Sequence, residues 1–454
     1  MSHLALARFQ FGSTTTYHFF FVPLTMGLSL LVAYMEWVYV RTKDVRYQKL
    51  ARFFGHLFMI NFALGVVTGL VQEFQFGMNW SEYSRFMGDI FGVPLAIEAL
   101  LAFFLESTFL GLWFFTWDRV PPALHNLFIW LVAIGSNLSG LWILIANSFM
   151  QYPVGYKLEN GRAVLTDFAA LVFSPHVWLQ FPHTALAALM TAAFFVIAVA
   201  AWHLRRNHRT ELFLPALRIG LWTGLIAGLL VMLIGHFQAD FIVEHQPMKF
   251  AAMEALWEDV HEPAPWTLVA SIDEKHMAND WEIKIPGVLS MLAHAKDGVF
   301  KGIKTIQAEY EKAYGPGNYI PPVAVTFWSF RVMVAAGILM FLLAAWGLWL
   351  AYRGRLLQAP RTLALLTWAV LLPYIANTTG WWVTEFGRQP WMVQGLLTTP
   401  QGVTPPEVVP ASAVLLTAIG FTLLYLILGA IDVWLLIKNA KADPEATGHA
   451  AAVY

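Results

Sequence analysis

Four side chains that can bind iron lie in or beside long apolar stretches of the sequence. Each of the four belongs to a different stretch. His18, His183, Met333 and Glu385 offer imidazole, thioether and carboxylate groups, which are all chemistries that can hold iron. A His and a Met on different helices can bind one haem from both faces, whereas a lone His or carboxylate leaves one face of the iron open for a gas. Each residue alone also fits an interfacial or packing role, so these four positions do not by themselves identify a haem protein.

Two glutamates occur within the third apolar stretch, where an ionised side chain costs at least about 2.5 kcal/mol. Glu98 and Glu106 are eight residues apart. In a regular α-helix they would lie ~80° apart around the axis and ~12 Å apart along it. This spacing suits a ladder of carboxylates that carries protons. It would equally suit the coupling carboxylates of a transporter.

The composition is that of a polytopic membrane protein. Of the 454 residues, 58% are hydrophobic and 13% are charged, against roughly 25% charged in soluble domains. The absence of cysteine excludes disulfides, cysteine-ligated metal clusters, covalent c-type haem and thiol catalysis. A net charge of −1 gives no reason to expect a nucleic-acid partner.

The apolar stretches predict an all-α fold, a polytopic membrane helix bundle of about nine transmembrane helices. The runs are continuous rather than alternating, so they favour helices over barrel strands. The predicted spans are 17–40, 50–73, 91–116, 124–148, 178–203, 217–237, 323–352, 362–384 and 413–437. We expect residues 1–454 to form a single membrane-embedded subunit.

The distribution of Lys and Arg predicts the orientation of the bundle. One set of short loops carries most of these residues and is therefore expected to face the cytoplasm. This set comprises 41–49, 117–123, 204–218, 353–361 and the tail from 438. The N-terminus then lies outside and the C-terminus inside. The segment 238–322, between spans six and seven, is predicted to be a partly helical outer loop over the bundle.

Several strings, in order along the chain, resemble subunit I of cytochrome bd-type quinol oxidases, of the type with a short quinol-binding loop. They are FALGVVTGLVQEFQFGMNWSEYS (62–84), PLAIEALLAFFLESTF (94–109), GSNLSGLWILIANSFMQ (135–151), FRVMVAAG (330–337) and GRQPW (387–391). The resemblance covers nearly the whole chain. It implies oxidation of quinol and reduction of dioxygen to water, with two b haems, usually one haem d, and no copper.

The resemblance assigns the iron ligands. It implies that His183 and Met333 bind the low-spin haem b, with Arg331 beside that haem. It implies that His18 and Glu385 are the axial ligands of the high-spin haem b and haem d. We favour His18 for haem d, with Glu98 on its open side, and Glu385 for the high-spin haem b.

The resemblance also assigns the quinol and proton residues. Segment 238–322 matches the quinol-binding loop, in which Lys249 and Glu254 match the pair that binds quinol. Glu106, with Ser107 and Ser139, matches an inner proton route toward Glu98. The polar or aromatic residues matched around the haems are Asn147, Trp381 and Arg388.

Three positions depart from the family pattern. His236 stands where other members tend to carry an acidic residue, and it either contacts a haem propionate or quinol or is an interface residue. His176 is a second extra outer histidine. Asn377 replaces a second glutamate of some members, which removes support for a second proton route.

The resemblance further implies partners and a location. Members pair with a second membrane subunit, subunit II, and often with a small single-span subunit, in the cytoplasmic (inner) membrane of bacteria or archaea. Proton uptake inside and release outside would generate proton motive force without pumping. Three alternatives stay open: an all-b-haem oxidase of the same family, a haem protein that only carries electrons, and a non-redox transporter.

Overall fold

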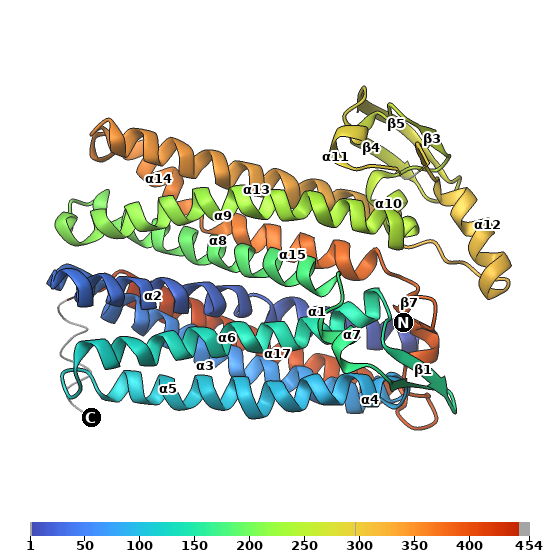
Figure 1. Ribbon diagram of the computed structural model, residues 1–454, viewed down its shortest axis with the longest axis horizontal. Helices are drawn as coiled ribbons and strands as arrows, with labels where there is room; N and C mark the ends of the chain where they lie inside the picture. The colour runs from blue at the N-terminus through green and yellow to red at the C-terminus, as the bar shows by residue number, and fades with distance from the viewer. Residues whose placement is uncertain (1, 296, 445–454) are drawn as a thin grey trace.

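The structure, a computed structural model, describes residues 2–295 and 297–444. Long helices lie side by side along one axis (Figure 1). Within the described residues, nine helical segments are long and apolar enough to cross a membrane. They are His3–Thr42, Val45–Met78, Ser81–Phe115, Pro122–Gln151, Phe168–Leu204, Thr210–His245, Val323–Tyr352, Pro360–Phe386 and Ala411–Ala440. The predicted membrane helix bundle and its number of spans are confirmed.

Five of these spans consist of one long helix, and four are built from shorter pieces. The helices are α1 (His3–His18), α2 (Val22–Thr42), α3 (Val45–Met78), α4 (Ser81–Ile97), α5 (Phe104–Phe115), α6 (Pro122–Gln151), α7 (Phe168–Val172), α8 (Val177–Leu204), α9 (Thr210–His245), α13 (Val323–Tyr352), α14 (Pro360–Trp368), α15 (Leu371–Phe386) and α17 (Ala411–Ala440). A 3₁₀ turn, Leu356–Gln358, precedes α14.

Two interruptions in the spans place predicted site residues. The first span breaks at Phe19–Phe21, between α1 and α2, so that His18 is the last residue of α1. Pro23 lies in the first turn of α2, where its missing N–H leaves no donor unpaired. In the third span, Glu98–Phe103 forms a π-helical turn between α4 and α5, shortly after Pro94. The ~80° offset predicted for a regular helix therefore does not hold between Glu98 and Glu106, because a π turn winds more residues per turn.

The predicted outer loop forms a small mixed domain at one end of the bundle. Helix α9 continues to His245, so the independent part, called here the outer domain, comprises residues 246–322. It contains α10 (Pro247–Glu254), β3 (Val260–His261), β4 (Trp266–Asp273), β5 (Ala278–Ile285), α11 (Leu289–Leu292), β6 (Val299–Phe300) and α12 (Ile303–Tyr314). Strands β4 and β5 form an antiparallel hairpin, and β3 pairs with β6. The prediction of helix was incomplete here, since it did not include these strands.

The remaining short elements lie at the same end of the molecule as the outer domain (Figure 1). They are β1 (Tyr156–Glu159), β2 (Arg162–Leu165), β7 (Trp391–Val393), β8 (Leu397–Thr398) and α16 (Thr399–Gly402). The basic loops 43–44, 116–121 and 205–209 connect helices at the opposite end. That this opposite end faces the cytoplasm stays a prediction from the charges.

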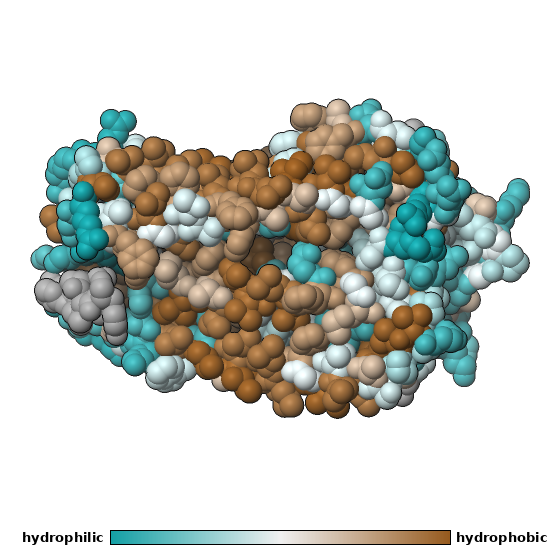
Figure 2. All heavy atoms as spheres, turned by 90° about the horizontal axis from the view of Figure 1, so that it is seen from below, coloured by the Kyte–Doolittle hydropathy of each residue, from teal (hydrophilic) through white to brown (hydrophobic). Residues whose placement is uncertain are grey.

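Helix α8 is the centre of the apolar core and packs against α2 and α9. Small residues allow this close packing, because a Cβ at Gly27 would overlap the backbone carbonyl of Ala188. A separate core between the outer domain and the start of α13 includes Phe250, Phe300 and Phe327. Figure 2 shows apolar side chains over the middle of one face and hydrophilic ones at both ends, as expected for a protein surrounded by lipid.

Candidate functional site

A large cavity inside the bundle collects most of the predicted site residues. Its volume is about 2330 Å³, and α1, α3, α4, α6 and α15 contribute to its wall. The predicted residues that line it are His18, Glu98, Glu106, Ser139, Asn147, Trp381, Glu385 and Arg388. The wall thus combines candidate metal ligands, carboxylates and a cation in a mostly apolar enclosure. Such an enclosure suits a large apolar cofactor with charged groups at its edge.

The ring of His18 is oriented by a neighbour on α3. Its Nδ1 lies 2.9 Å from the Oγ1 of Thr68. Thr68 donates its own hydroxyl proton to the carbonyl of Gly65 at 2.9 Å, so it accepts from His18. Nε2 is then the unprotonated nitrogen, the form that ligates a metal. A Cβ at Gly69 would lie 3.2 Å from Cε1 of His18, so glycine keeps space open beside the ring.

Glu385 is held in the wall of the cavity by two side chains. Asn147 donates to its Oε1 at 3.1 Å, and Arg388, one helical turn further along, pairs with its Oε2. Asn147 is itself fixed, because its Oδ1 accepts a hydrogen bond from Gln180 at 2.8 Å. The carboxylate is therefore oriented, as the ligands of metal sites usually are.

Three buried donors near Glu385 have no protein partner. Nε and Nη1 of Arg388 and Nε1 of Trp381 find no hydrogen-bond acceptor within the described part of the chain. The Trp381 ring stacks on Phe19, with 5.2 Å between the ring centroids. Buried unpaired donors are costly, and a guanidinium with free N–H groups is the usual partner of a carboxylate. These donors fit a cofactor that carries carboxylates.

The two glutamates of the third span each bond a serine of α6. Ser139 donates to Glu98 at 2.6 Å, and Ser136 donates to Glu106. Both glutamates line the cavity, but the partner of Glu106 is Ser136, which sequence reasoning missed. The predicted neighbour Ser107 instead faces the carbonyl of Phe104 on its own helix, at 3.5 Å.

His183 and Met333 are placed away from the large cavity, among four helices that pack together, α8, α9, α13 and α15. The Nδ1 of His183 is buried and has no hydrogen-bond partner among the described residues. A Cβ at Gly235 on α9 would lie 3.5 Å from Cε1 of His183. A Cβ at Gly380 on α15 would lie 2.9 Å from Sδ of Met333. Glycine thus faces each candidate ligand where a flat cofactor would need room.

The outer domain buries both predicted quinol residues on α10, each with its own partner. Lys249 donates to Oε1 of Gln151 at 2.6 Å. Burial, with the charge of Arg388, lowers the pKa of Lys249 to about 7. Glu254 pairs with Arg331 at 2.6 Å. Burial raises the pKa of Glu254, and the guanidinium of Arg331 limits the rise.

Arg331, predicted to lie beside the low-spin haem, is in contact with the outer domain. Its guanidinium pairs with Glu254 and donates to the backbone carbonyl of Thr267 at 2.6 Å. It also lies over the ring of Phe327, with Cζ 4.4 Å from the centroid. The ion pair and the hydrogen bond connect span seven to the outer domain, whereas Phe327 lies on the same helix as Arg331.

His176 and Asn377, two positions that depart from the family pattern, each have a hydrogen-bond partner on a neighbouring helix. His176 is buried, and its Nδ1 lies 3.0 Å from Oγ of Ser148. Asn377 donates to Thr191 at 2.9 Å. Glu73 on α3 lines the large cavity beside Glu98 and was not predicted as a site residue. Its place in QEFQF, at the end of a span, was the available signal.

Comparison with known proteins gives the family. Residues 6–444 match the family described as cytochrome bd terminal oxidase subunit I. The chain is also 53% identical over 450 residues to cytochrome bd ubiquinol oxidase subunit 1 of Bacillus subtilis (strain 168), with 99% of this chain and 96% of the relative covered. The chain belongs to the cytochrome bd oxidase subunit I family.

Further members of the family agree over the same length. Cytochrome bd-II ubiquinol oxidase subunit 1 of Escherichia coli (strain K12) is 40% identical over 500 residues, covering 97% of each chain. The solved structure of bd oxidase from Geobacillus thermodenitrificans superimposes with a TM-score of 0.85 at 31% identity, covering 96% of this chain and 98% of that one. The family and fold predicted from the sequence strings are confirmed.

Proposed function

We propose that this chain is the haem-containing subunit I of a terminal oxidase that oxidises quinol and reduces dioxygen to water. The observation that carries the proposal is the large cavity. Its wall combines the oriented side chains of His18 and Glu385, two glutamates and the unpaired donors of Arg388. Relatives named ubiquinol oxidases support the same activity. When bound, haem supplies the transfer of electrons from quinol to dioxygen, four electrons in total for each dioxygen.

The donor chemistry fits haem at two places. His183 and Met333 would hold a low-spin haem b between α8 and α13, with Gly235 and Gly380 leaving space for the ring. His18 would hold haem d, with Glu98 on its open side, and Glu385 would hold the high-spin haem b. The free N–H groups of Arg388 would bind propionates in a forked pair. An all-b-haem oxidase is the alternative within the family.

The quinol would be bound by the outer domain near Lys249 and Glu254. A pKa of about 7 lets Lys249 exchange a proton at neutral pH. Glu254 offers a carboxylate oxygen whose position is fixed by Arg331. Protons removed from the quinol would leave on the outer side of the membrane.

Protons for water would arrive from the cytoplasmic side through Glu106 and Glu98. Ser136 and Ser139 hold these carboxylates, so each side chain keeps a hydrogen-bond partner in either protonation state. Uptake inside and release outside would separate charge across the membrane without a pump.

The chain would work in the bacterial cytoplasmic membrane as a multi-pass subunit beside subunit II. Exposed apolar side chains along α17, among them Leu416, Leu426 and Trp434, offer a face for lipid or for that partner. We also propose a small single-span subunit, as the resemblance in sequence implies.

A dithionite-reduced minus air-oxidised visible spectrum of the purified complex, repeated with carbon monoxide, tests this proposal. A chlorin band in the red that shifts with carbon monoxide, beside b-haem bands, is the expected result. Only b-haem bands, part of which shift with carbon monoxide, would support the all-b alternative. A folded complex without haem bands would overturn the proposed function.

A further inference from the structure

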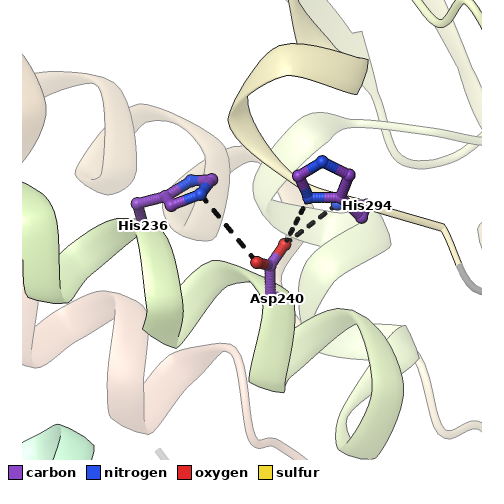
Figure 3. A group of neighbouring side chains, drawn as sticks. All are labelled: His236, Asp240 and His294. Atoms are coloured by element: carbon purple, nitrogen blue, oxygen red, sulfur yellow. Dashed lines mark hydrogen bonds and ion pairs between the residues drawn. The ribbon is translucent and has the colours of Figure 1, made fainter.

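Two histidines and an aspartate meet where span six contacts the outer domain. His236 and Asp240 are one turn apart on α9, and His294 follows α11 (Figure 3). One ligand atom from each residue lies within 4.8 Å of the others. None of the three lines the large cavity, so this cluster is separate from the proposed haem and quinol sites.

The separations within the cluster approach those of a bound transition metal. Nε2 of His236 lies 4.0 Å from Oδ2 of Asp240, and Nδ1 of His294 lies 3.4 Å from Oδ1 of Asp240. Zinc bonds of 2.0–2.1 Å at tetrahedral angles place neighbouring ligand atoms about 3.3 Å apart. A small inward movement of the His236 ring therefore completes three ligands of a site.

Hydrogen bonds to backbone atoms orient two of the ligands. Nδ1 of His236 lies 2.9 Å from the carbonyl oxygen of Leu292. A carbonyl only accepts, so Nδ1 carries the proton, and Nε2, which faces Asp240, is left as the metal-binding nitrogen. Oδ1 of Asp240 accepts from the backbone N–H of His294 at 2.9 Å. Support of a ligating histidine by a backbone carbonyl is the usual arrangement around metals.

We propose that His236, Asp240 and His294 bind one divalent transition-metal cation of the zinc type, with water in the open fourth position. Imidazole and carboxylate ligands suit Zn²⁺ better than Ca²⁺ or Mg²⁺, which prefer oxygen alone. Half-exposed side chains let the ion enter from the outer solution, since the exposed fractions are 35% for His236 and Asp240 and 70% for His294.

The bound cation would join the outer domain to span six. His294 lies in the segment between α11 and β6. At the start of α11, the backbone N–H of Leu289 donates a hydrogen bond to the carbonyl of Ala264 at 3.1 Å. His236 and Asp240 belong to the helix that continues toward α10, where Lys249 lies. The cation would therefore restrain the segment around His294 against a fixed helix.

Equilibrium dialysis of Zn²⁺ into the metal-stripped, detergent-purified complex tests the site without turnover, so the result does not depend on the haem or quinol proposals. The variants are His236→Gln, Asp240→Asn and His294→Gln. The matched control is His276→Gln, which removes another outer histidine paired with one aspartate, Asp273, at 2.5 Å. We expect one tight equivalent in the wild type and the control, weakened at least ~10-fold in each of the three variants.

A second measurement covers the case in which a variant fails to fold. In the unaltered complex, Zn²⁺ should slow amide hydrogen exchange around 292–295, and Mg²⁺ at the same concentration should not. Equal Zn²⁺ binding by the wild type and all variants would overturn the proposal. So would unchanged hydrogen exchange on adding Zn²⁺.

Discussion

The guanidinium of Arg331 on span seven forms a buried ion pair with Glu254 of the outer domain, with 2.6 Å between Nη2 and Oε2. The exposed fractions of the two side chains are 6% and 3%. The pair therefore connects the proposed quinol-binding helix α10 to the membrane helix that carries Met333. Removing either partner would leave a buried charge without compensation.

We predict that Arg331→Met destabilises the packing of the outer domain by about 3–5 kcal/mol, the usual cost of leaving one buried charge unpaired. Thermal unfolding of the purified complex, with proteolysis of the outer domain, measures the effect. Arg353→Met is the matched control, because Arg353 lies at the opposite end, over Trp349. An Arg331→Met complex as stable as the control would contradict the role given to this pair.

Quinol oxidation should depend on pH through Lys249. Burial lowers its pKa to about 7, so the amine is mostly charged below pH 7 and mostly neutral above it. If the neutral amine accepts a quinol proton, the rate should rise as the pH increases through about 7 and then level off.

The variant Lys249→Gln should be slow and should lack this rise, which a pH series of quinol-dependent oxygen uptake would show. The lowered pKa of Lys249 also predicts how the stability of the folded protein depends on pH. Between about pH 7 and 10 the folded chain binds fewer protons at Lys249 than the unfolded chain does. The burial of Lys249 therefore destabilises the fold most below pH 7, and this destabilisation decreases as the pH rises. An unchanged pH profile in Lys249→Gln would contradict the proposed proton transfer.

Glu106 and its serine partner should be needed for proton delivery rather than for haem binding. We predict that Glu106→Gln stops oxygen reduction and leaves the haem spectrum intact. Ser136→Ala should slow turnover, because it removes the hydroxyl that bonds Glu106. Ser107→Ala is the matched control, since that hydroxyl faces a carbonyl of its own helix. A fully active Glu106→Gln enzyme would end the proton-route proposal.

Gly380 should be required for methionine ligation. A Cβ there would lie 2.9 Å from Sδ of Met333, so Gly380→Ala has to displace the thioether. We predict loss of the low-spin signal in the oxidised electron paramagnetic resonance spectrum. Gly337→Ala on the helix of Met333 is the control, because its Cβ would meet no atom within 4 Å. Equal low-spin signals in both variants would show that this glycine has no such role.

The sequence predicted the spans and many of the residues that line the large cavity, because both can be recognised from neighbouring residues in the chain. Apolar runs mark spans, and ionisable residues within them are costly enough to be noticed, as with Glu106. The bonds from Ser136 to Glu106 and from Lys249 to Gln151 join residues far apart in the chain. No spacing rule predicts such pairs, because they depend on how helices pack.

Two further differences have physical causes. The π turn at Glu98–Phe103 changed the relation between Glu98 and Glu106, and the only signal for it was Pro94. The ion pair of Arg331 with Glu254 was not predicted, because the two residues lie far apart in the chain. The place of Arg331 beside a haem stays a prediction. The strands of the outer domain were not predicted, because β3 and β6 have only two residues each and the pairing of β4 with β5 is interrupted by register shifts.

Haem content of ligand variants tests the central claim most directly. The variants are His18→Ala, His183→Ala and, as a control, His176→Ala. The ring of His176 has Nδ1 3.0 Å from Oγ of Ser148. The account predicts that His183→Ala loses the low-spin b-haem band, that His18→Ala loses the carbon monoxide-sensitive band, and that His176→Ala keeps both. Retention of every band in His18→Ala and His183→Ala would contradict it.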